Sequence, residues 1–169
     1  MPFAPEPSLD TLYVDHHGWL HRLLYHRVGC TETAADLAQD AFLRLLVRDE
    51  DVRRIREPRA YLRRIADGLL ANHWRRRDIE QAYLDALRLQ PEGVSPSPEQ
   101  HHLVIETLLH IDKVLRGLPA RVRRAFLLSR LDGVRYGEIA MTLGVSERMV
   151  KKYIAQAMLH CLRAAESLP

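Results

Sequence analysis

Two stretches of the sequence concentrate positive charge together with side chains that can contact nucleic acid. Residues 53–77 hold nine arginines against two acidic residues, and residues 119–163 hold nine lysines and arginines against three. The first stretch also carries an amide at Asn72 and an indole at Trp74. Cations bind phosphates and aromatic rings stack on unpaired bases, so this mixture suits single-stranded DNA better than a plain phosphate clamp. Two basic stretches in different halves of the chain indicate a polyanionic partner bound at two places.

Within the first basic stretch, candidate DNA contacts lie in the loop before a predicted helix and along that helix. Two alternatives stay open: Trp74 can equally be a core residue, and Arg63 or Arg64 can instead lie on a solvated helix face. The candidate contacts to DNA in this stretch are Arg53, Arg54, Arg56, Arg59, Arg63, Arg64, Asn72, His73, Trp74, Arg75, Arg76 and Arg77.

The second basic stretch contains the pattern of a helix-turn-helix at residues 136–154. Ala140 is small enough for two helices to approach closely, Gly144 can take the positive φ of the turn, and Ser146 can cap the second helix. The apolar residues that should fill the space between the helices are Ile139, Leu143, Val145, Val150 and Ile154.

The second helix of such a motif is the one that enters the major groove, with its N-terminal residues near the base edges. Lys151 is expected to read a base and Lys152 to bind a phosphate, although both lysines can be phosphate contacts. A purely structural helical corner is the alternative for the motif as a whole. The candidate contacts to double-stranded DNA are Ser146, Arg148, Met149, Lys151, Lys152 and Gln156.

Asp36 and Asp40 are four residues apart, so they share one face of a helix and repel each other by a few tenths of a kcal/mol. A structural explanation exists for each. With Thr33 as the N-cap, Asp36 lies in the first turn, where the helix dipole stabilises a carboxylate. Asp40 can pair with Arg44 on the surface. The pair is not expected to act in acid–base catalysis, because no pocket-forming or metal-ligand pattern surrounds it.

No metal site, cofactor or enzymatic activity is expected from the remaining reactive side chains. The histidines cluster at 16–17 and 101–102 and at His110 and His160, but adjacent histidines on a helix point about 100° apart and do not readily share one ion. Cys30 and Cys161 lie far apart without CxxC spacing, which favours structural, buried thiols over a disulfide or a zinc site.

The elements that must position these residues are helices, because apolar residues recur at three and four positions along almost the whole chain. The pattern therefore predicts an all-α fold. The predicted helices span residues 9–28, 33–47, 58 to beyond 74, 98–116, 119–132, 136–143 and 146–164.

The composition places a linker between two small helical domains. Residues 91–100, PEGVSPSPEQ, hold three prolines, a glycine and two serines, which favours extended and solvated chain. The predicted domains are residues 1–89 and 101–169, joined by a flexible linker at 90–100. With 47% hydrophobic residues in 169, the chain can bury a core, so a disordered chain is excluded. Residues 1–7 do not resemble a signal peptide, and a cytoplasmic location is expected.

Four runs in this order resemble the group IV, or extracytoplasmic-function, sigma factors of bacterial RNA polymerase, over about residues 9–164. ADLAQDAFLRL at 35–45 is similar to the helix of that family that binds core polymerase, and PRAYLRRIA at 58–66 through WRRR at 74–77 resembles the helix for the minus-10 element. LPARVRRAFLLSRLDG at 118–133 and the following helix-turn-helix are similar to the minus-35-binding domain. The resemblance implies sigma region 2 for residues 1–89 and sigma region 4 for residues 101–169.

The resemblance narrows to the iron-citrate, or ferric siderophore, type of that family. The residues that carry this narrower resemblance are HHGWL at 16–20, FLLSRLDG at 126–133, VKKYIA at 150–155 with HCL at 160–162, and PEG and PSPE in the linker. It implies a factor that directs transcription of iron or siderophore uptake genes under the control of a membrane-bound anti-sigma regulator, through the cytoplasmic segment of that regulator. The iron connection then acts through regulation, and no iron ligand is needed in this chain.

The resemblance also implies the partners and assigns roles to the candidate residues. The partners are the beta and beta-prime subunits of core RNA polymerase and promoter DNA. Asp36, Asp40 and Arg44 would contact the polymerase, the loop and helix of the first basic stretch would hold an unstacked base of the minus-10 element, and the helix-turn-helix would bind the minus-35 element. The alternative function is a stand-alone helix-turn-helix transcriptional regulator, for which a ligand or phosphoacceptor domain would be expected in the first half.

Overall fold

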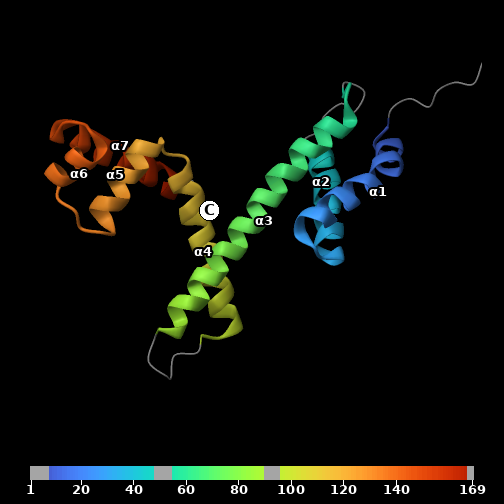
Figure 1. The fold of residues 1–169 in the computed structure, drawn as a ribbon, viewed down its shortest axis with the longest axis horizontal. Coiled ribbons are helices and arrows are strands. Elements are labelled where there is room, and N and C mark those ends of the chain that lie inside the picture. The colour runs from blue at the N-terminus through green and yellow to red at the C-terminus, as the bar shows by residue number, and fades with distance from the viewer. Residues whose placement is uncertain (1–7, 48–54, 90–95, 167–169) are drawn as a thin grey trace, which may run out of the picture. The chain divides into compact units, whose positions relative to one another are not determined.

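Seven helices make up the described part of the chain, which covers residues 8–47, 55–89 and 96–166 of the computed structural model (Figure 1). No strand occurs within those ranges, which confirms the all-α prediction. The chain divides into two compact units, Met1–Gln81 and Ala82–Pro169, and the division falls inside the third helix. The predicted linker at 90–100 stays a prediction, and its residues 90–95 lie outside the described ranges.

The first unit begins with two helices joined by a two-residue connection. Helix α1, Leu9–Val28, is opened by Ser8, whose hydroxyl accepts a hydrogen bond from the Thr11 backbone N–H at 3.2 Å. It ends at Gly29, which takes the left-handed conformation with a φ of 70°. Helix α2 follows as Thr31–Val47 and packs against α1.

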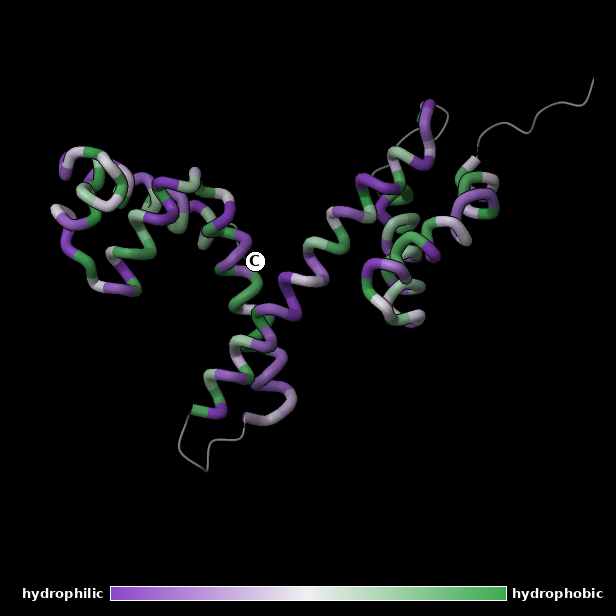
Figure 2. Tube along the Cα trace, in the orientation of Figure 1, coloured by the Kyte–Doolittle hydropathy of each residue, from purple (hydrophilic) through white to green (hydrophobic). Residues whose placement is uncertain are grey.

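Helix α3, Pro58–Arg88, completes the core of the first unit with the residues of its first half. Its first residue is a proline, as predicted, because the fixed φ of proline suits the first turn and its missing N–H would have no helical partner there. The largest fully buried side chains of this core are Leu20, Leu24, Leu45 and Leu62. Hydrophobic and hydrophilic residues alternate around the helices, as expected for amphipathic helices that bury one face (Figure 2).

The second unit contains four helices after the end of α3. Helix α4, Pro98–Arg116, starts with a capping box in which Ser97 and Gln100 exchange hydrogen bonds at 3.0 and 3.2 Å. Helix α5, Ala120–Arg130, follows Pro119, and the pair α6, Tyr136–Leu143, and α7, Glu147–Glu166, comes last. All four helices begin and end within two residues of the prediction.

The five residues expected between the helices of the helix-turn-helix occupy the places predicted for them. Ile139, Val150 and Ile154 are buried together, and Leu143 and Val145 are half-buried against them. A second small cluster, with Leu118, Val122 and Ala157 at its centre, joins α5 to α7. The helix-turn-helix is therefore supported from behind by α5.

Three expectations around the start of α2 are wrong. The helix begins at Thr31, and the Cys30 carbonyl accepts its first hydrogen bond, from Ala34 N–H at 3.0 Å. Thr33 is thus inside the helix and is not its N-cap, and Asp36 lies in the second turn, beyond the main influence of the helix dipole. Cys30 is exposed and is not the buried thiol that was expected.

No helix among the described residues has both the length and the apolar character needed to cross a bilayer.

Candidate nucleic-acid interface

The turn between α6 and α7 sets the orientation of the candidate recognition helix. Gly144 has a φ of 63°, and the Val145 N–H donates to the Ala140 carbonyl at 3.0 Å, which closes the end of α6. At Ser146, two residues after Gly144, the side-chain hydroxyl accepts a hydrogen bond from the Met149 backbone N–H at 3.2 Å. The predicted cap of α7 is therefore formed, and the first turn of α7 is fixed relative to α6.

All six candidate minus-35 residues are exposed. Arg148, Lys152 and Gln156 follow one another at intervals of four residues, so they share one helix face, while Val150 and Ile154 are buried on the opposite side. Lys151 lies beside this face and forms an exposed ion pair with Glu147 at 3.4 Å. The free surface of α7 thus presents three cations and an amide, which suits both phosphates and base edges.

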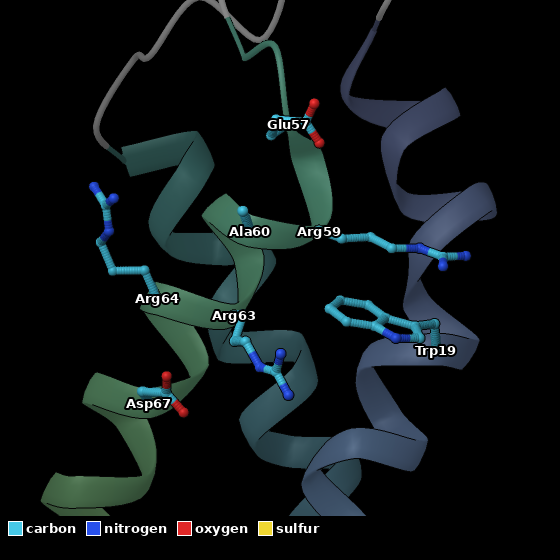
Figure 3. A pocket seen from close by; sticks show the side chains of 7 residues that line it. All are labelled: Trp19, Glu57, Arg59, Ala60, Arg63, Arg64 and Asp67. Atoms are coloured by element: carbon cyan, nitrogen blue, oxygen red, sulfur yellow. The ribbon is translucent and has the colours of Figure 1, made fainter.

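The basic residues of α3 separate onto different faces of that helix. The helical repeat places Arg59, Arg63, Trp74 and Arg77 within about 60° of one another, whereas Arg64 lies elsewhere on the circumference. Figure 3 shows Arg59 and Arg63 on the side that faces α1 and Arg64 pointing away from it.

Trp74 is 40% exposed and is not a core residue. The Arg77 guanidinium carbon lies 5.5 Å from the centre of its ring, and the His73 ring meets it edge-on at 5.3 Å. An exposed indole between a guanidinium and an imidazole is a suitable platform for an unpaired base. Of the two alternatives for Trp74, the core and the surface, the structure therefore supports the surface.

The other minus-10 candidates differ in exposure. Arg56 and Asn72 are exposed, Arg75 is half-buried, and Arg76 is half-buried and pairs with Glu80 at 3.0 Å. Arg53 and Arg54 lie outside the described residues.

An open pocket of about 620 Å³ lies between α1 and the start of α3, within the first unit. Arg59, Arg63 and Arg64 of this pocket are predicted DNA contacts, whereas no contact was predicted on α1, which contributes Trp19. No signal along α3 could have found Trp19, because its part in the pocket depends on tertiary packing. The residues that line the pocket are Trp19, Glu57, Arg59, Ala60, Arg63, Arg64 and Asp67.

On α2, Asp36 and Asp40 are both exposed and Arg44 is half-buried. Within the described ranges no ion pair joins Asp40 to Arg44, so the surface pair that would explain Asp40 structurally is not formed. A small groove of about 300 Å³ with Phe42, Leu43 and Leu46 in its wall lies beside this face. An uncompensated carboxylate next to apolar surface suits docking onto a partner that combines cations with apolar side chains.

The reactive side chains form no metal centre among the described residues, where no group of three or more potential ligands comes together. His17 and His21, which are four residues apart on α1, stack their rings with centroids 6.4 Å apart. His160 holds two helices together, since its Nε2 donates to the Val114 carbonyl at 2.9 Å. Hydrogen bonds from the Thr33 side chain and from the Thr33 and Glu32 N–H groups hold the pKa of the Cys30 thiol below its ordinary value.

Comparison with known proteins gives matches over both units. Residues 12–79 match the family model of Sigma-70 region 2, and residues 108–161 match that of Sigma-70, region 4. The chain is 47% identical over 155 residues to the ferric citrate uptake sigma factor FecI of Escherichia coli, with 92% of this chain and 89% of that protein covered. It is 31% identical over 157 residues to the ECF RNA polymerase sigma factor SigE of Mycolicibacterium smegmatis, with 89% of this chain and 59% of that protein covered. A solved RsbN–BldN complex matches at 22% identity with a TM-score of 0.34, over 92% of this chain and 90% of that chain, a score too low to indicate a shared arrangement.

Proposed function

This chain belongs to the sigma-70 family, in its extracytoplasmic-function branch, and from that premise we propose that it binds core RNA polymerase and directs promoter-specific initiation of transcription. The first unit then contacts the polymerase and the minus-10 element, and the second unit contacts the minus-35 element. The observation that carries the proposal is the presence, in one chain, of a basic aromatic face on α3 and an exposed recognition helix on α7.

The relative with 47% identity is named for ferric citrate uptake, and we propose that this chain serves genes of the same class. It would act in the cytoplasm, where polymerase is, under a membrane-bound anti-sigma regulator whose cytoplasmic segment binds it. This regulation requires no iron ligand in the chain, and the proposed function of the chain includes no catalytic step.

Two linked measurements test the proposal. Gel filtration with purified core polymerase should show co-elution of the chain with core. Run-off transcription with the reconstituted holoenzyme on genomic DNA, followed by sequencing of the transcripts, should give starts upstream of iron or siderophore uptake genes. Failure to co-elute, or failure to initiate on any genomic promoter, would overturn the assignment.

A stand-alone helix-turn-helix regulator is not favoured. Such a protein would carry a ligand-binding or phosphoacceptor domain in its first half, whereas residues 12–79 match Sigma-70 region 2. The co-elution experiment also separates these two functions, because a stand-alone regulator would bind promoter DNA without core.

A further inference from the structure

The pocket between α1 and α3 is built around the ring of Trp19. This residue is half-buried and packs against the core of the first unit, so its indole is held in place. Arg59 reaches across from the first turn of α3, and its guanidinium carbon lies 5.4 Å from the centre of the ring (Figure 3). A cation over an aromatic face is attracted by the ring quadrupole, and the planar guanidinium also stacks on it.

This contact orders a side chain that would otherwise be free. Arg59 is exposed, and no ion pair within the described part of the chain holds it. A long arginine loses rotamer freedom when it binds a ligand, and a contact that fixes it beforehand removes part of that loss. The Trp19 ring therefore favours one position of the Arg59 guanidinium at the wall of the pocket.

The charges around the pocket are mixed, which distinguishes it from a simple anion site. Arg59, Arg63 and Arg64 contribute three cations, and Glu57 and Asp67 contribute two carboxylates. The Asp67 carboxylate is partly compensated by Arg27 at 3.9 Å, so the pocket remains positive. Guanidinium groups bind phosphates, ring and guanidinium planes stack on bases, and carboxylates accept hydrogen bonds from base amino groups. A nucleotide offers a phosphate, a flat base and base amino groups to these three kinds of side chain.

We propose that Trp19 is a positioning residue for the single-stranded DNA contact expected at the start of α3: its ring holds the Arg59 guanidinium toward the phosphate of a nucleotide in this pocket. The inference rests on the proposed function, since opened promoter DNA is what supplies a single strand next to α3. It adds α1 to the DNA-binding surface, and it gives Trp19 a role distinct from its packing.

The test measures binding of a fluorescent single-stranded oligonucleotide, carrying the non-template minus-10 sequence found by run-off transcription, to the reconstituted holoenzyme. Trp19→Leu keeps apolar volume against the core but removes the aromatic face, and Arg59→Ala removes the cation. Each should weaken binding about two- to five-fold, the range set by an exposed cation–π contact. The double variant should be no weaker than Arg59→Ala, and Trp19→Phe should restore most of the binding lost in Trp19→Leu. Arg59→Ala should also reduce the slope of log affinity against log salt by about 0.7.

Two variants on α1 outside the pocket serve as controls. Tyr25→Leu removes an exposed aromatic ring and Arg22→Ala removes an exposed cation, and both should leave oligonucleotide binding unchanged. Additive losses in the Trp19→Leu, Arg59→Ala double variant, or a Phe variant as weak as the Leu variant, would show that Trp19 does not act through Arg59.

The outcomes separate this inference from the proposed function. Wild-type protein that fails to bind core overturns the proposed function. Wild-type holoenzyme that initiates normally, together with unchanged oligonucleotide binding by Arg59→Ala, overturns only the nucleotide pocket. If Trp19→Leu shows no thermal unfolding transition, that variant does not fold and cannot be used. Arg59→Ala and Trp19→Phe then still test the role of Trp19, because neither variant removes aromatic packing from the core.

Discussion

At the scale of single residues, Asp40 is the sharpest test of the proposed polymerase contact. It is exposed, and its neighbour one turn earlier, Asp36, carries the same charge. Asp40→Arg gains attraction to Asp36 but meets Arg44 at the same four-residue spacing, so the two effects offset each other and the free energy of unfolding should stay within a few tenths of a kcal/mol. The same change places like charges across the proposed contact with beta-prime, and affinity for core should fall at least about tenfold.

Competition against another sigma factor for core polymerase measures that affinity, and thermal unfolding measures the stability. Glu32→Arg is the matched control, because Glu32 is also an exposed acid on α2 but lies outside the proposed contact. Unchanged competition by Asp40→Arg would remove Asp40 from the interface.

A second prediction concerns α7, the proposed recognition helix, in which two adjacent lysines should have different roles. Lys151→Ala should cost about 1 to 3 kcal/mol and relax specificity at one base pair of the minus-35 element. Lys152→Ala should weaken all sequences alike and reduce the salt slope by roughly one unit. Lys151 must leave Glu147 to reach a base, but an exposed pair of this kind is worth at most about 1 kcal/mol, so the cost is small.

A promoter library mutated across the minus-35 region, transcribed with each variant, distinguishes these effects. Lys113→Ala, an exposed lysine on α4 away from the motif, is the control. Normal initiation by Arg148→Ala, Lys151→Ala and Lys152→Ala on a minus-35-dependent promoter would show that α7 is not the recognition helix.

The exposure of single residues could be predicted from the sequence, but contacts between distant helices could not. The exposure of all six minus-35 candidates follows from helical periodicity, because the buried stripe of α7 fixes which residues remain outside. The part of Trp19 in a pocket with Arg59 could not be predicted, because forty positions separate the two residues and only the packing of α1 against α3 joins them. Sequence periodicity assigns a residue to a face but does not say which other helix covers that face.

At the scale of elements, the helix boundaries were predictable where proline, glycine or serine marks them. Pro58, Pro98 and Pro119 stand at or just before the first residues of helices, and Gly29 and Gly144 end two others. The start of α2 was missed because its N-cap is a cysteine, and the preferred capping residue Thr33 follows three positions later.

The turn of the helix-turn-helix gives a prediction about stability. Gly144 has a φ of 63°, and a Cβ placed there would meet nothing within 4 Å, so the cost of Gly144→Ala comes from backbone strain alone. We expect a loss of about 1 to 2 kcal/mol in the free energy of unfolding, and a smaller loss for Gly144→Asn, because asparagine tolerates the left-handed region better.

Urea unfolding of the full chain, followed by circular dichroism, measures these losses. Gly137→Ala is the matched control on the same helix: the added Cβ would meet only the Glu147 carboxylate at 3.9 Å, and alanine favours helix, so stability should not fall. Equal effects of the two alanine substitutions would contradict the assignment of the cost to the positive φ.

At the scale of the whole molecule, each unit carries apolar surface that its own core does not cover. In the first unit, Leu43 and Leu46 are exposed next to Asp40. In the second, a pocket of about 350 Å³ is lined by apolar side chains of α4, α5 and α7, including Ile111, Leu127 and Leu131. Exposed apolar surface of this kind marks protein interfaces, and it lies in both units.

The last prediction concerns how a regulator would use these surfaces. A partner that binds the apolar surface of the first unit covers part of the proposed polymerase-binding face, and the same partner can extend onto the apolar pocket of the second unit without disturbing the separate cores. We therefore expect the cytoplasmic segment of the proposed anti-sigma regulator, at one equivalent, to block co-elution with core polymerase while the circular dichroism spectrum of this chain stays helical. Leu43→Ser together with Leu46→Ser should weaken a regulator seated on the first unit, whereas Leu127→Ser should weaken one seated on the second. Core binding that persists at one equivalent of a bound regulator segment would show that control does not act by occlusion, and a loss of helical signal on binding would show that the regulator acts by unfolding.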